Sequence, residues 1–393
     1  MSGAASSPAC AAPSSGTPRT GVLIISPIAV ARGDGGWHTL DLWARDINAQ
    51  AALVPVTLVC PIQSTIEGNI GTLAPSITVL SSDAQTLAAA VARARCIQLP
   101  GNAGWRGARL ARQVLALARR HGTPVFLGIS SNRARTALLN SRHQGLARRA
   151  RALVHYVDIR FTQRWLARRC TGVFIVGEGL RSLVHGVNTN LHVGIASWIS
   201  EKDIRTDRPA PGSAALRVCM AGRLESMKGF HIGLDALALL RPQLTPQITL
   251  IGAGPEKAAL KAQVERLALE HFTLLEPVAY PGPFFTLLDT QDLVLLTNLN
   301  DEQPRLVFDA LCRGALPVCP DAAAYVALGL DQRLLYRQGD PQALAQCVRG
   351  LEDPEVRAEL RALSAPLLQR HTLDAMHADR LAWMQASATP SPS

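Results

Sequence analysis

The chain alternates short aliphatic runs with longer stretches of helical period, and it repeats this pattern through both halves. The runs that predict buried strands are 22–25, 56–59, 77–80, 96–99, 125–127 and 173–176 in the first half, and 218–221, 248–251, 293–296 and 316–319 in the second. Between them, apolar residues recur every three or four positions, which predicts helices. In the first such unit, the glycine-rich loop 33–36 is predicted to lead from the strand 22–25 into a helix with Leu40, Trp43, Ala44 and Ile47 on its apolar face. Strands that alternate with helices in this way are typical of parallel sheets covered by helices.

Length and a change in composition divide the chain into two units. A chain of 393 residues suits two domains of roughly 150 to 200 residues better than one. Between 202 and 215 the sequence turns to Asp, Arg, Pro, Gly and Ser, as in an inter-domain linker. We therefore predict an α/β fold with two Rossmann-like, doubly wound domains that face a central cleft. The predicted parts are a disordered tail at 1–19, an N-terminal domain at 20–205, a C-terminal domain at 206–370, a helix at 371–386 that packs back on the N-terminal domain, and a disordered tail at 387–393.

Three absences in the sequence narrow the class of protein. The longest uncharged apolar run, 21–31, is much shorter than the roughly 20 residues of a membrane-spanning helix. The eight cysteines form no CxxC pair, and no histidines cluster at metal-ligand spacing. The first 19 residues lack the apolar core of a signal peptide. We expect a protein of the reducing cytoplasm without a metal site.

Positive charge is concentrated in one part of the first half. The formal net charge is +10, yet segment 101–169 carries fifteen Arg, no Lys, no Glu and one Asp, a sum of +14. Such a patch predicts contact with an anionic surface, here the inner face of the cytoplasmic membrane, through Arg109, Arg112 and Arg120 and through the arginines of 148–151. A plain solvated face is one alternative. Nucleic acid is another, but the segment lacks interleaved aromatic residues and matches no groove-reading motif, so no nucleic-acid partner is expected.

The segment 222–229, GRLESMKG, leaves a predicted strand and enters a predicted helix with two cations, Arg223 and Lys228. The free N–H groups and the dipole of a helix N-terminus favour anions, so these side chains could neutralise a diphosphate as it becomes a leaving group. Spacing alone fits two solvated surface cations equally well. Only four of the forty basic residues are Lys, however, and a Lys in this sequence indicates a need for a slim, mobile charge.

Two further motifs follow. Residues 252–255, GAGP, form a turn that lets backbone approach a ligand at Gly254, although such turns are also common structural punctuation. Asp301 follows the strand run that ends at 296, and Asp309 stands eight residues later in the next predicted helix. Two carboxylates along one cleft wall accept hydrogen bonds from vicinal hydroxyls. In isolation, each is equally an ordinary loop or surface acid.

In this order, the three motifs resemble the C-terminal domain of the family 4 retaining glycosyltransferases of GT-B fold. The motifs GRLxxxKG, GxGP and acid-x7-acid are followed by a predicted strand with the pattern Gly-x-x-Pro-Val, formed by Gly314, Pro317 and Val318. The resemblance covers 218–329. It implies a GT-B architecture with the donor in the C-terminal domain and the acceptor on the N-terminal side.

The resemblance also implies a role for each site residue. Arg223 and Lys228 would hold the diphosphate of a nucleotide-sugar donor. Asp309 would bind the ribose, and Asp301 would contact the transferred sugar. The other donor contacts would come from Gly254, from the backbone amides of Arg305, Leu306 and Val307, and from Gly35 and Gly36 in the N-terminal domain.

The function implied is transfer of a hexose from a UDP-sugar or GDP-sugar with retention of configuration, without a metal or other cofactor. The acceptor implied is a lipid-linked saccharide in exopolysaccharide or other cell-surface polysaccharide synthesis. A nicotinamide dehydrogenase is the enzymatic alternative for two Rossmann-like domains, but the loop 33–36 lacks the third glycine of GxGxxG.

The sequence departs from the family pattern at several positions. Both acids are Asp where the family usually has Glu, and Glu302 stands where a Gly is usual. A catalytically inactive GT-B partner subunit is therefore an open alternative. The loop after 125–127 also lacks the His that many members place there. The residues that could contact acceptor or sugar in its place are Ser131, Asn132, His38 and His155.

Overall fold

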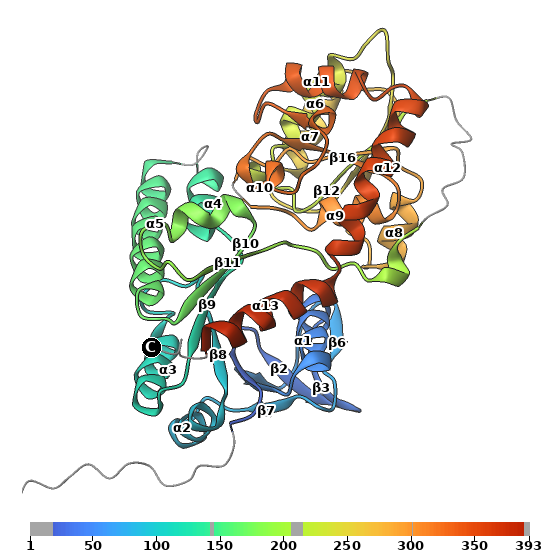
Figure 1. The fold of residues 1–393 in the computed structure, drawn as a ribbon. Coiled ribbons are helices and arrows are strands. Elements are labelled where there is room, and N and C mark those ends of the chain that lie inside the picture. The colour runs from blue at the N-terminus through green and yellow to red at the C-terminus, as the bar shows by residue number, and fades with distance from the viewer. Residues whose placement is uncertain (1–18, 142–144, 206–214, 301, 389–393) are drawn as a thin grey trace, which may run out of the picture.

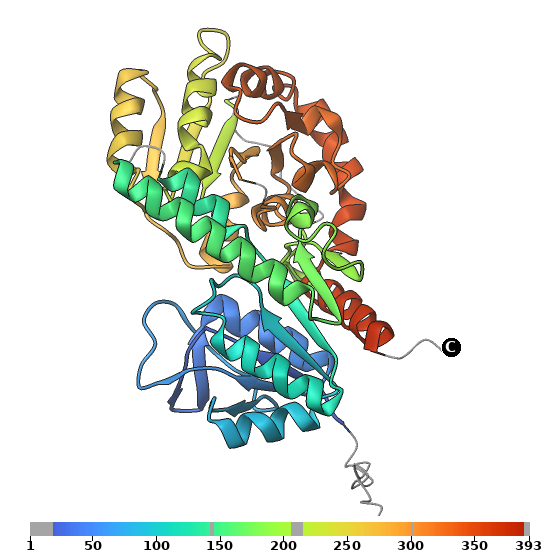
Figure 2. The ribbon, with the colours of Figure 1, turned by 90° about the vertical axis from the view of Figure 1, so that its left-hand side faces the viewer.

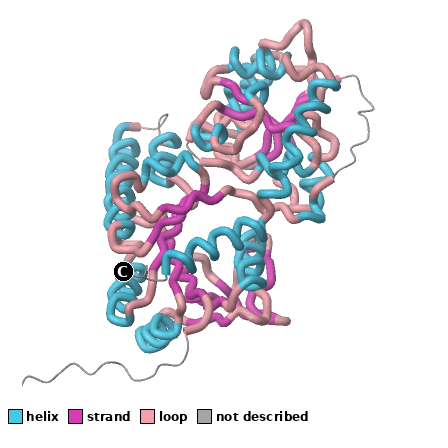
Figure 3. Tube along the Cα trace, in the orientation of Figure 1, coloured by secondary structure: helices cyan, strands magenta, loops and turns pink. Residues whose placement is uncertain are grey.

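The structure is a computed structural model with two parallel sheets, one in each half of the chain (Figure 1; Figure 3). It describes residues 19–141, 145–205, 215–300 and 302–388. Outside the described residues lie 1–18 of the predicted tail 1–19, 389–393 of the predicted tail 387–393, most of the predicted linker at 206–214, and Asp301. Residues 387 and 388 belong to the last helix. Among the described helices, none combines the length and the apolar character that crossing a bilayer requires.

The N-terminal sheet has seven parallel strands in the order β11-β10-β9-β8-β1-β4-β7. Its strands are β1 (Val22–Ile25), β4 (Val56–Val59), β7 (Thr78–Leu80), β8 (Cys96–Pro100), β9 (Val125–Ile129), β10 (Gly172–Val176) and β11 (Leu191–Gly194). Its helices are α1 (Asp41–Leu53), α2 (Ala84–Arg93), α3 (Arg109–His121), α4 (Arg133–Asn140) and α5 (Leu146–Ala167).

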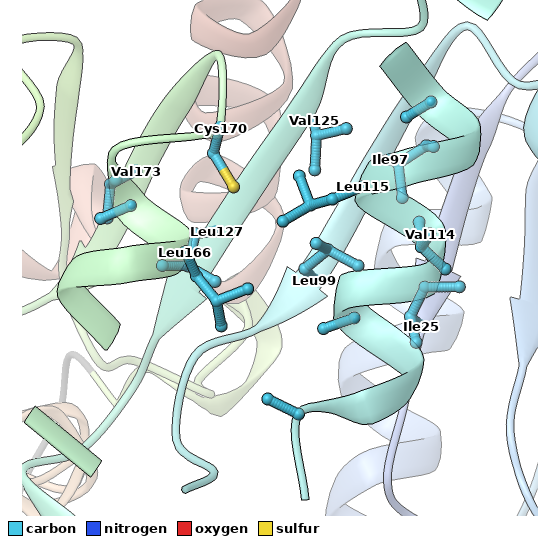
Figure 4. Packing of buried hydrophobic residues seen from close by; sticks show 14 of the residues in the cluster. Ile25, Ile97, Leu99, Val114, Leu115, Val125, Leu127, Leu166, Cys170 and Val173 are labelled. Carbon is cyan, nitrogen blue, oxygen red and sulfur yellow. The ribbon is translucent and has the colours of Figure 1, made fainter. Parts of the chain in front are cut away.

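Helices cover both faces of this sheet, which explains why its central strands are almost wholly aliphatic. One face packs on α2, α3 and α5, where Leu115 and Leu166 meet Leu99 and Leu127 of the sheet (Figure 4). The other face packs on α1 and on the C-terminal helix. All four residues of β1 are buried because helices lie on both sides of it.

The C-terminal sheet has six parallel strands in the order β14-β13-β12-β15-β16-β17. Its strands are β12 (Arg217–Ala221), β13 (Gln247–Ile251), β14 (Phe272–Leu275), β15 (Leu293–Leu295), β16 (Leu316–Pro320) and β17 (Leu335–Tyr336). Its helices are α6 (Phe230–Ala238), α7 (Lys257–Arg266), α8 (Gly282–Leu288), α9 (Leu306–Cys312), α10 (Ala323–Val326), α11 (Pro341–Arg349) and α12 (Pro354–Arg370). The prediction of an α/β fold with parallel sheets is confirmed in both halves.

Local sequence determines several helix ends. α2, α11 and α12 begin after Asp83, Asp340 and Asp353, whose carboxylates accept hydrogen bonds from backbone N–H groups of the first turn. α3 ends at Gly122, which adopts a φ of 59° and so suits glycine.

The last helix, α13 (Leu373–Ala388), leaves the C-terminal half and lies beside α1 on the N-terminal sheet (Figure 1). His377 Nε2 lies 3.2 Å from Asp46 Oδ1, and Arg380 donates to Gln50 Oε1 at 2.8 Å. Trp383 donates to Asn190 Oδ1 at 3.0 Å and packs edge-on against Phe126 of the sheet. These contacts tie the two halves together at the end of the chain.

A small mixed sheet corrects one prediction. β2 (Val30–Gly33) and β3 (Gly36–Leu40) form an antiparallel hairpin, with β5 (Ile62–Gln63) and β6 (Ile70–Thr72) at its edges. The glycine-rich loop therefore turns between two strands, and the prediction that it leads from a strand into a helix is wrong. Gly35 and Gly36 have φ values of 88° and 132°, which suit this hairpin turn.

Candidate functional site

The loop between β12 and α6 carries the two predicted cations. The Arg223 side chain is 73% exposed, and its Nη1 lies 3.0 Å from Glu225 Oε1. Lys228 is half-buried in a short 3-10 helix, η3 (Ser226–Lys228). Burial lowers the pKa of its ammonium group; Glu302 and Glu225 act against this, and Arg223 adds to it. One cation thus faces solvent, and the other lies among carboxylates.

This loop is held in place by close backbone contacts. A Cβ atom on Gly229 would lie 2.1 Å from the Thr297 carbonyl oxygen, so only glycine fits there. The hydroxyl of Thr297, just after β15, donates to the Lys228 carbonyl at 2.7 Å. The position of Lys228 is therefore set from the neighbouring strand.

The glycines of the GAGP turn have a packing role. A Cβ atom on Gly252 would lie 1.9 Å from the Gly222 carbonyl oxygen, and one on Gly254 would lie 2.5 Å from that of Leu224. Leu224 also donates to the Ala253 carbonyl at 2.9 Å. The turn thus supports the loop with the two cations, which accounts for both glycines without a ligand.

Asp309 lies in α9 and is almost inaccessible, with 1% of its surface exposed. The Tyr280 hydroxyl donates to Oδ1 at 3.1 Å, and Arg305 Nε lies 3.7 Å from Oδ2. Arg305 in turn stacks over the rings of Tyr280 and Trp198, with its Cζ 4.0 and 5.1 Å from their centroids. Burial raises the pKa of Asp309 to about 6, against the lowering effects of Arg305 and Tyr280.

Glu302 and Gln303 reach across to the N-terminal half. Glu302 Oε1 accepts a hydrogen bond of 2.8 Å from the backbone N–H of Asn132, at the start of α4. The buried amide of Gln303 exchanges two hydrogen bonds with the backbone of Ala196, of 2.8 and 3.0 Å. The segment that follows β15 therefore forms part of the contact between the two halves.

The N-terminal half also contacts the cation loop directly. The Asn140 amide, at the end of α4, accepts from the Met227 backbone N–H at 3.3 Å and donates to Glu225 Oε2 at 3.2 Å. The structure thus describes a closed arrangement, in which α4 lies against the loop that holds Lys228.

A cavity of about 930 Å³ lies between the two halves. Its lining is mostly apolar and includes Ile24, Ile28, Trp43, Leu99, Phe174, Trp198, Val278 and Met376. Tyr280, Gln303 and Arg305 contribute polar groups from the C-terminal side, and Ser130, Asn102 and Arg133 do so from the N-terminal side. Through Tyr280 and Arg305, this cavity borders the carboxylate of Asp309.

The structure brings only some of the predicted site residues to this region. Arg223 and Lys228 lie together, and Arg305, Leu306, Val307 and Asp309 lie together on α9 and its first turn. Asn132 reaches the interface through its backbone, because its side chain caps α4 by accepting from Arg135 N–H at 3.1 Å. Ser131 precedes it and is half-buried.

The N-terminal glycine and histidine candidates lie elsewhere. Gly35 and Gly36 form the hairpin tip and do not line the cavity. His38 is held within that small sheet, with Nδ1 3.1 Å from Thr72 Oγ1 and Nε2 3.2 Å from the Asp34 carbonyl. His155 is exposed on α5. These candidates thus lie outside the cavity lining, as Arg223, Lys228 and Asp309 also do.

Tyr280, Trp198 and Glu302 are the site residues that sequence reasoning did not assign. Tyr280 follows β14, a half-exposed edge strand that the aliphatic pattern does not mark. Had that strand been predicted, Tyr280 would have fallen at the same sheet edge as the other motifs. Within the described ranges, no group of three or more His, Cys, Asp or Glu side chains is placed to hold a metal ion.

The structure has two doubly wound domains in contact with each other, and two cations follow the first strand of the second domain. This is the architecture of the GT-B class of glycosyltransferase fold. The family model described as glycosyl transferases group 1 matches residues 215–353, which make up most of the C-terminal domain. Sequence comparison with curated proteins gives no match.

Solved structures share the whole architecture at low sequence identity. Sucrose-phosphate synthase from Thermosynechococcus elongatus has a TM-score of 0.66 at 12% identity, over 94% of this chain and 99% of that one. Anabaena HepE in complex with UDP has a TM-score of 0.62 at 18% identity, over 93% and 99% of the two chains. WaaG, a glycosyltransferase involved in lipopolysaccharide biosynthesis, has a TM-score of 0.58 at 11% identity, over 91% and 98%. These likenesses confirm the predicted GT-B fold.

Proposed function

We propose that the chain transfers a hexose from a nucleoside-diphosphate sugar to an acceptor bound in the interdomain cavity. UDP is the favoured nucleotide because HepE, which has the same fold, was solved with UDP and with UDP-glucose. GDP is the alternative. The reaction breaks the bond between the anomeric carbon and the diphosphate and forms a bond to an acceptor oxygen, with retention of configuration. The acceptor proton passes to the leaving phosphate, and no metal or further cofactor takes part.

The observation that carries this proposal is the pair Arg223 and Lys228 on the loop after β12. The loop's position is set by backbone contacts with Thr297 and with the GAGP turn, so its cations are preorganised. A partly desolvated ammonium next to the interface stabilises negative charge more strongly than a surface cation, because the local dielectric constant is lower. Lys228 would thus stabilise the diphosphate as it leaves.

The remaining donor contacts follow from the same arrangement. Asp309 would accept a hydrogen bond from a ribose hydroxyl once the Tyr280 hydroxyl moves aside. The backbone N–H groups of 305–307 would contact the phosphates. Asp301 would contact the transferred sugar.

The apolar lining of the cavity supports an acceptor with an apolar portion. A free saccharide would leave Ile24, Ile28, Trp43 and Phe174 without a matching surface. A saccharide linked to a lipid diphosphate supplies apolar surface, and its charge suits Arg133 and Arg305. We infer that the product enters exopolysaccharide or other cell-surface polysaccharide synthesis at the inner face of the cytoplasmic membrane.

Separate measurements of donor binding and of turnover test the two parts of this proposal. Titration calorimetry with UDP, GDP and NAD should give heat of binding with a nucleoside diphosphate alone. Lys228→Ala should lower kcat by about 10²-fold to 10³-fold, as removal of one oxyanion-stabilising group does elsewhere. Arg223→Ala should lower kcat only about tenfold, because water and salt screen the charge of this exposed side chain. Binding of NAD in place of UDP or GDP would contradict the proposal.

A further inference from the structure

Helix α5 presents a row of large apolar side chains to solvent. These are Leu146, Leu153, Val154, Val157 and Phe161, with exposed fractions of 82, 55, 70, 58 and 58%. Twelve large apolar residues are exposed among the described residues, and five of them are on this one helix. Single exposed apolar residues are ordinary, but a contiguous group of this kind marks a binding surface. We name these five residues the α5 stripe.

The stripe is one face of the helix. At 3.6 residues per turn, positions 146, 153, 157 and 161 recur on the same side, and 154 lies next to them. The buried residues of the helix, which include Ile159 and Leu166, lie on the opposite side, and Leu166 and Ala167 belong to the core cluster on the sheet. In Figure 2 the green α5 crosses the molecule on the side that faces the viewer. Within the described residues, nothing covers the stripe.

Cations border the stripe, and the one acid beside it on α5, Asp158, is half-buried. Arg149 and Arg151, in the first turns, flank it on its two sides, and Arg168 is exposed beyond its C-terminal end. The only acid of segment 101–169 is Asp158. Its Oδ1 accepts a hydrogen bond of 3.0 Å from the Trp105 backbone N–H, so this carboxylate already has a partner within the fold.

This combination selects one kind of partner. A second copy of the chain would bring two segments of +14 charge together, which like-charge repulsion opposes. An anionic lipid surface offers hydrocarbon for the apolar row and phosphates for the arginines at the same time. Interfacial helices have this composition, with large apolar residues on one face and cations beside them.

We propose that α5 docks the protein on an anionic membrane, with the α5 stripe inserted at the boundary between head groups and acyl chains. Arg149 and Arg151 then contact lipid phosphates on either side. This inference rests on the proposed function for its biological sense, because a lipid-linked acceptor resides in the same membrane. It also narrows the predicted contact to the arginines of 148–151 on α5, since Arg112 of α3 stacks on Trp105 at 4.1 Å and donates to its carbonyl.

Vesicle flotation of the full chain tests the proposal. The wild-type protein should float with vesicles of equal phosphatidylcholine and phosphatidylglycerol, and much less with phosphatidylcholine alone. Leu153→Ser with Val157→Ser should lower the partition coefficient at least tenfold. The matched control is Leu363→Ser on α12, since Leu363 and Leu153 have the same exposed fraction of 55%. Arg149→Gln with Arg151→Gln should abolish the preference for anionic lipid.

A depth measurement adds a second readout. Phe161→Trp should be quenched by brominated acyl chains in anionic vesicles, whereas Leu363→Trp should not. UDP binding by calorimetry should be unchanged in every variant, so failure of membrane docking is distinguished from failure of the proposed transferase function. Flotation of the stripe variant at the wild-type level would overturn the proposal. So would a wild-type protein that ignores anionic vesicles, or one that self-associates through the stripe in sedimentation.

Discussion

The hydroxyl of Tyr280 donates a hydrogen bond of 3.1 Å to Oδ1 of Asp309 and closes that carboxylate off from the interdomain cavity. Arg305 completes the closure by stacking over Tyr280 while its Nε lies 3.7 Å from Oδ2. Among the residues that the structure describes, Oδ2 has no hydrogen-bond partner. A ligand hydroxyl that reaches Asp309 must therefore displace Tyr280, and it finds an acceptor that is already desolvated.

Tyr280→Phe tests whether the two hydroxyls compete. The variant should bind UDP about tenfold more tightly, because the ribose no longer has to replace an internal hydrogen bond. The free energy of unfolding should fall by about 1 kcal/mol from loss of that bond. The control is Tyr336→Phe, which removes a hydroxyl bonded to the Leu296 carbonyl at 3.0 Å and should leave UDP affinity unchanged. Weaker UDP binding by Tyr280→Phe would mean that the hydroxyl itself serves the donor.

Asp309→Asn should change how stability depends on pH. Burial raises the pKa of Asp309 to about 6 from 3.8, so the folded state holds a proton that the unfolded state has lost between those values. The contribution of Asp309 to stability is therefore present below about pH 3.8 and is lost as the pH rises through 6. Relative to wild type, Asp309→Asn should gain about 2 kcal/mol between pH 4.5 and 7.5. Urea unfolding of both proteins at the two pH values measures this, and a constant difference would refute the assignment.

The central strands were predictable because their sequence reflects burial on both faces. β1 and β4 begin and end at the predicted residues, since helices on either side require an unbroken aliphatic run. The small mixed sheet was not predictable in the same way, because β2 and β3 are short and partly exposed. Its glycines fit a hairpin turn as well as a turn from strand to helix.

The site was predictable where one local segment carries both residues and geometry. Arg223 and Lys228 lie in the eight-residue segment 222–229, and the glycines at its two ends predict tight turns. The environment of Asp309 is different, because its partner Tyr280 lies 29 residues away on another strand end. The contact of Glu302 with Asn132 spans 170 residues and depends on how the two domains meet, which no local pattern encodes.

Gly252→Ala should damage both stability and donor binding. The added Cβ would lie 1.9 Å from the Gly222 carbonyl oxygen, so the loop that carries Arg223 must shift. We expect a loss of more than about 2 kcal/mol in the free energy of unfolding and at least tenfold weaker UDP binding. Gly282→Ala is the control, because its Cβ would have no neighbour within 4 Å. This change at the exposed first residue of α8 should alter the free energy of unfolding by less than about 0.5 kcal/mol and leave UDP binding unchanged. If the two variants have equal stability in thermal unfolding and equal UDP affinity in calorimetry, the GAGP turn does not hold the loop of Arg223 in place.

Glu302→Gln isolates the charge that faces Lys228. Glu302 accepts its interdomain hydrogen bond from Asn132 at 2.8 Å through one oxygen, and a glutamine oxygen can accept it equally well. The substitution therefore removes negative charge beside the proposed diphosphate site while the contact between the domains remains. UDP affinity at low salt should rise about threefold to tenfold, because like charges no longer repel. The gain should shrink in 0.5 M salt, where exposed charges are screened. Glu265→Gln, an exposed change on α7, should have no effect on UDP affinity and serves as the control for net charge. Weaker binding by Glu302→Gln, measured by calorimetry at both salt concentrations, would show that the carboxylate holds Lys228 in place and does not compete with the donor.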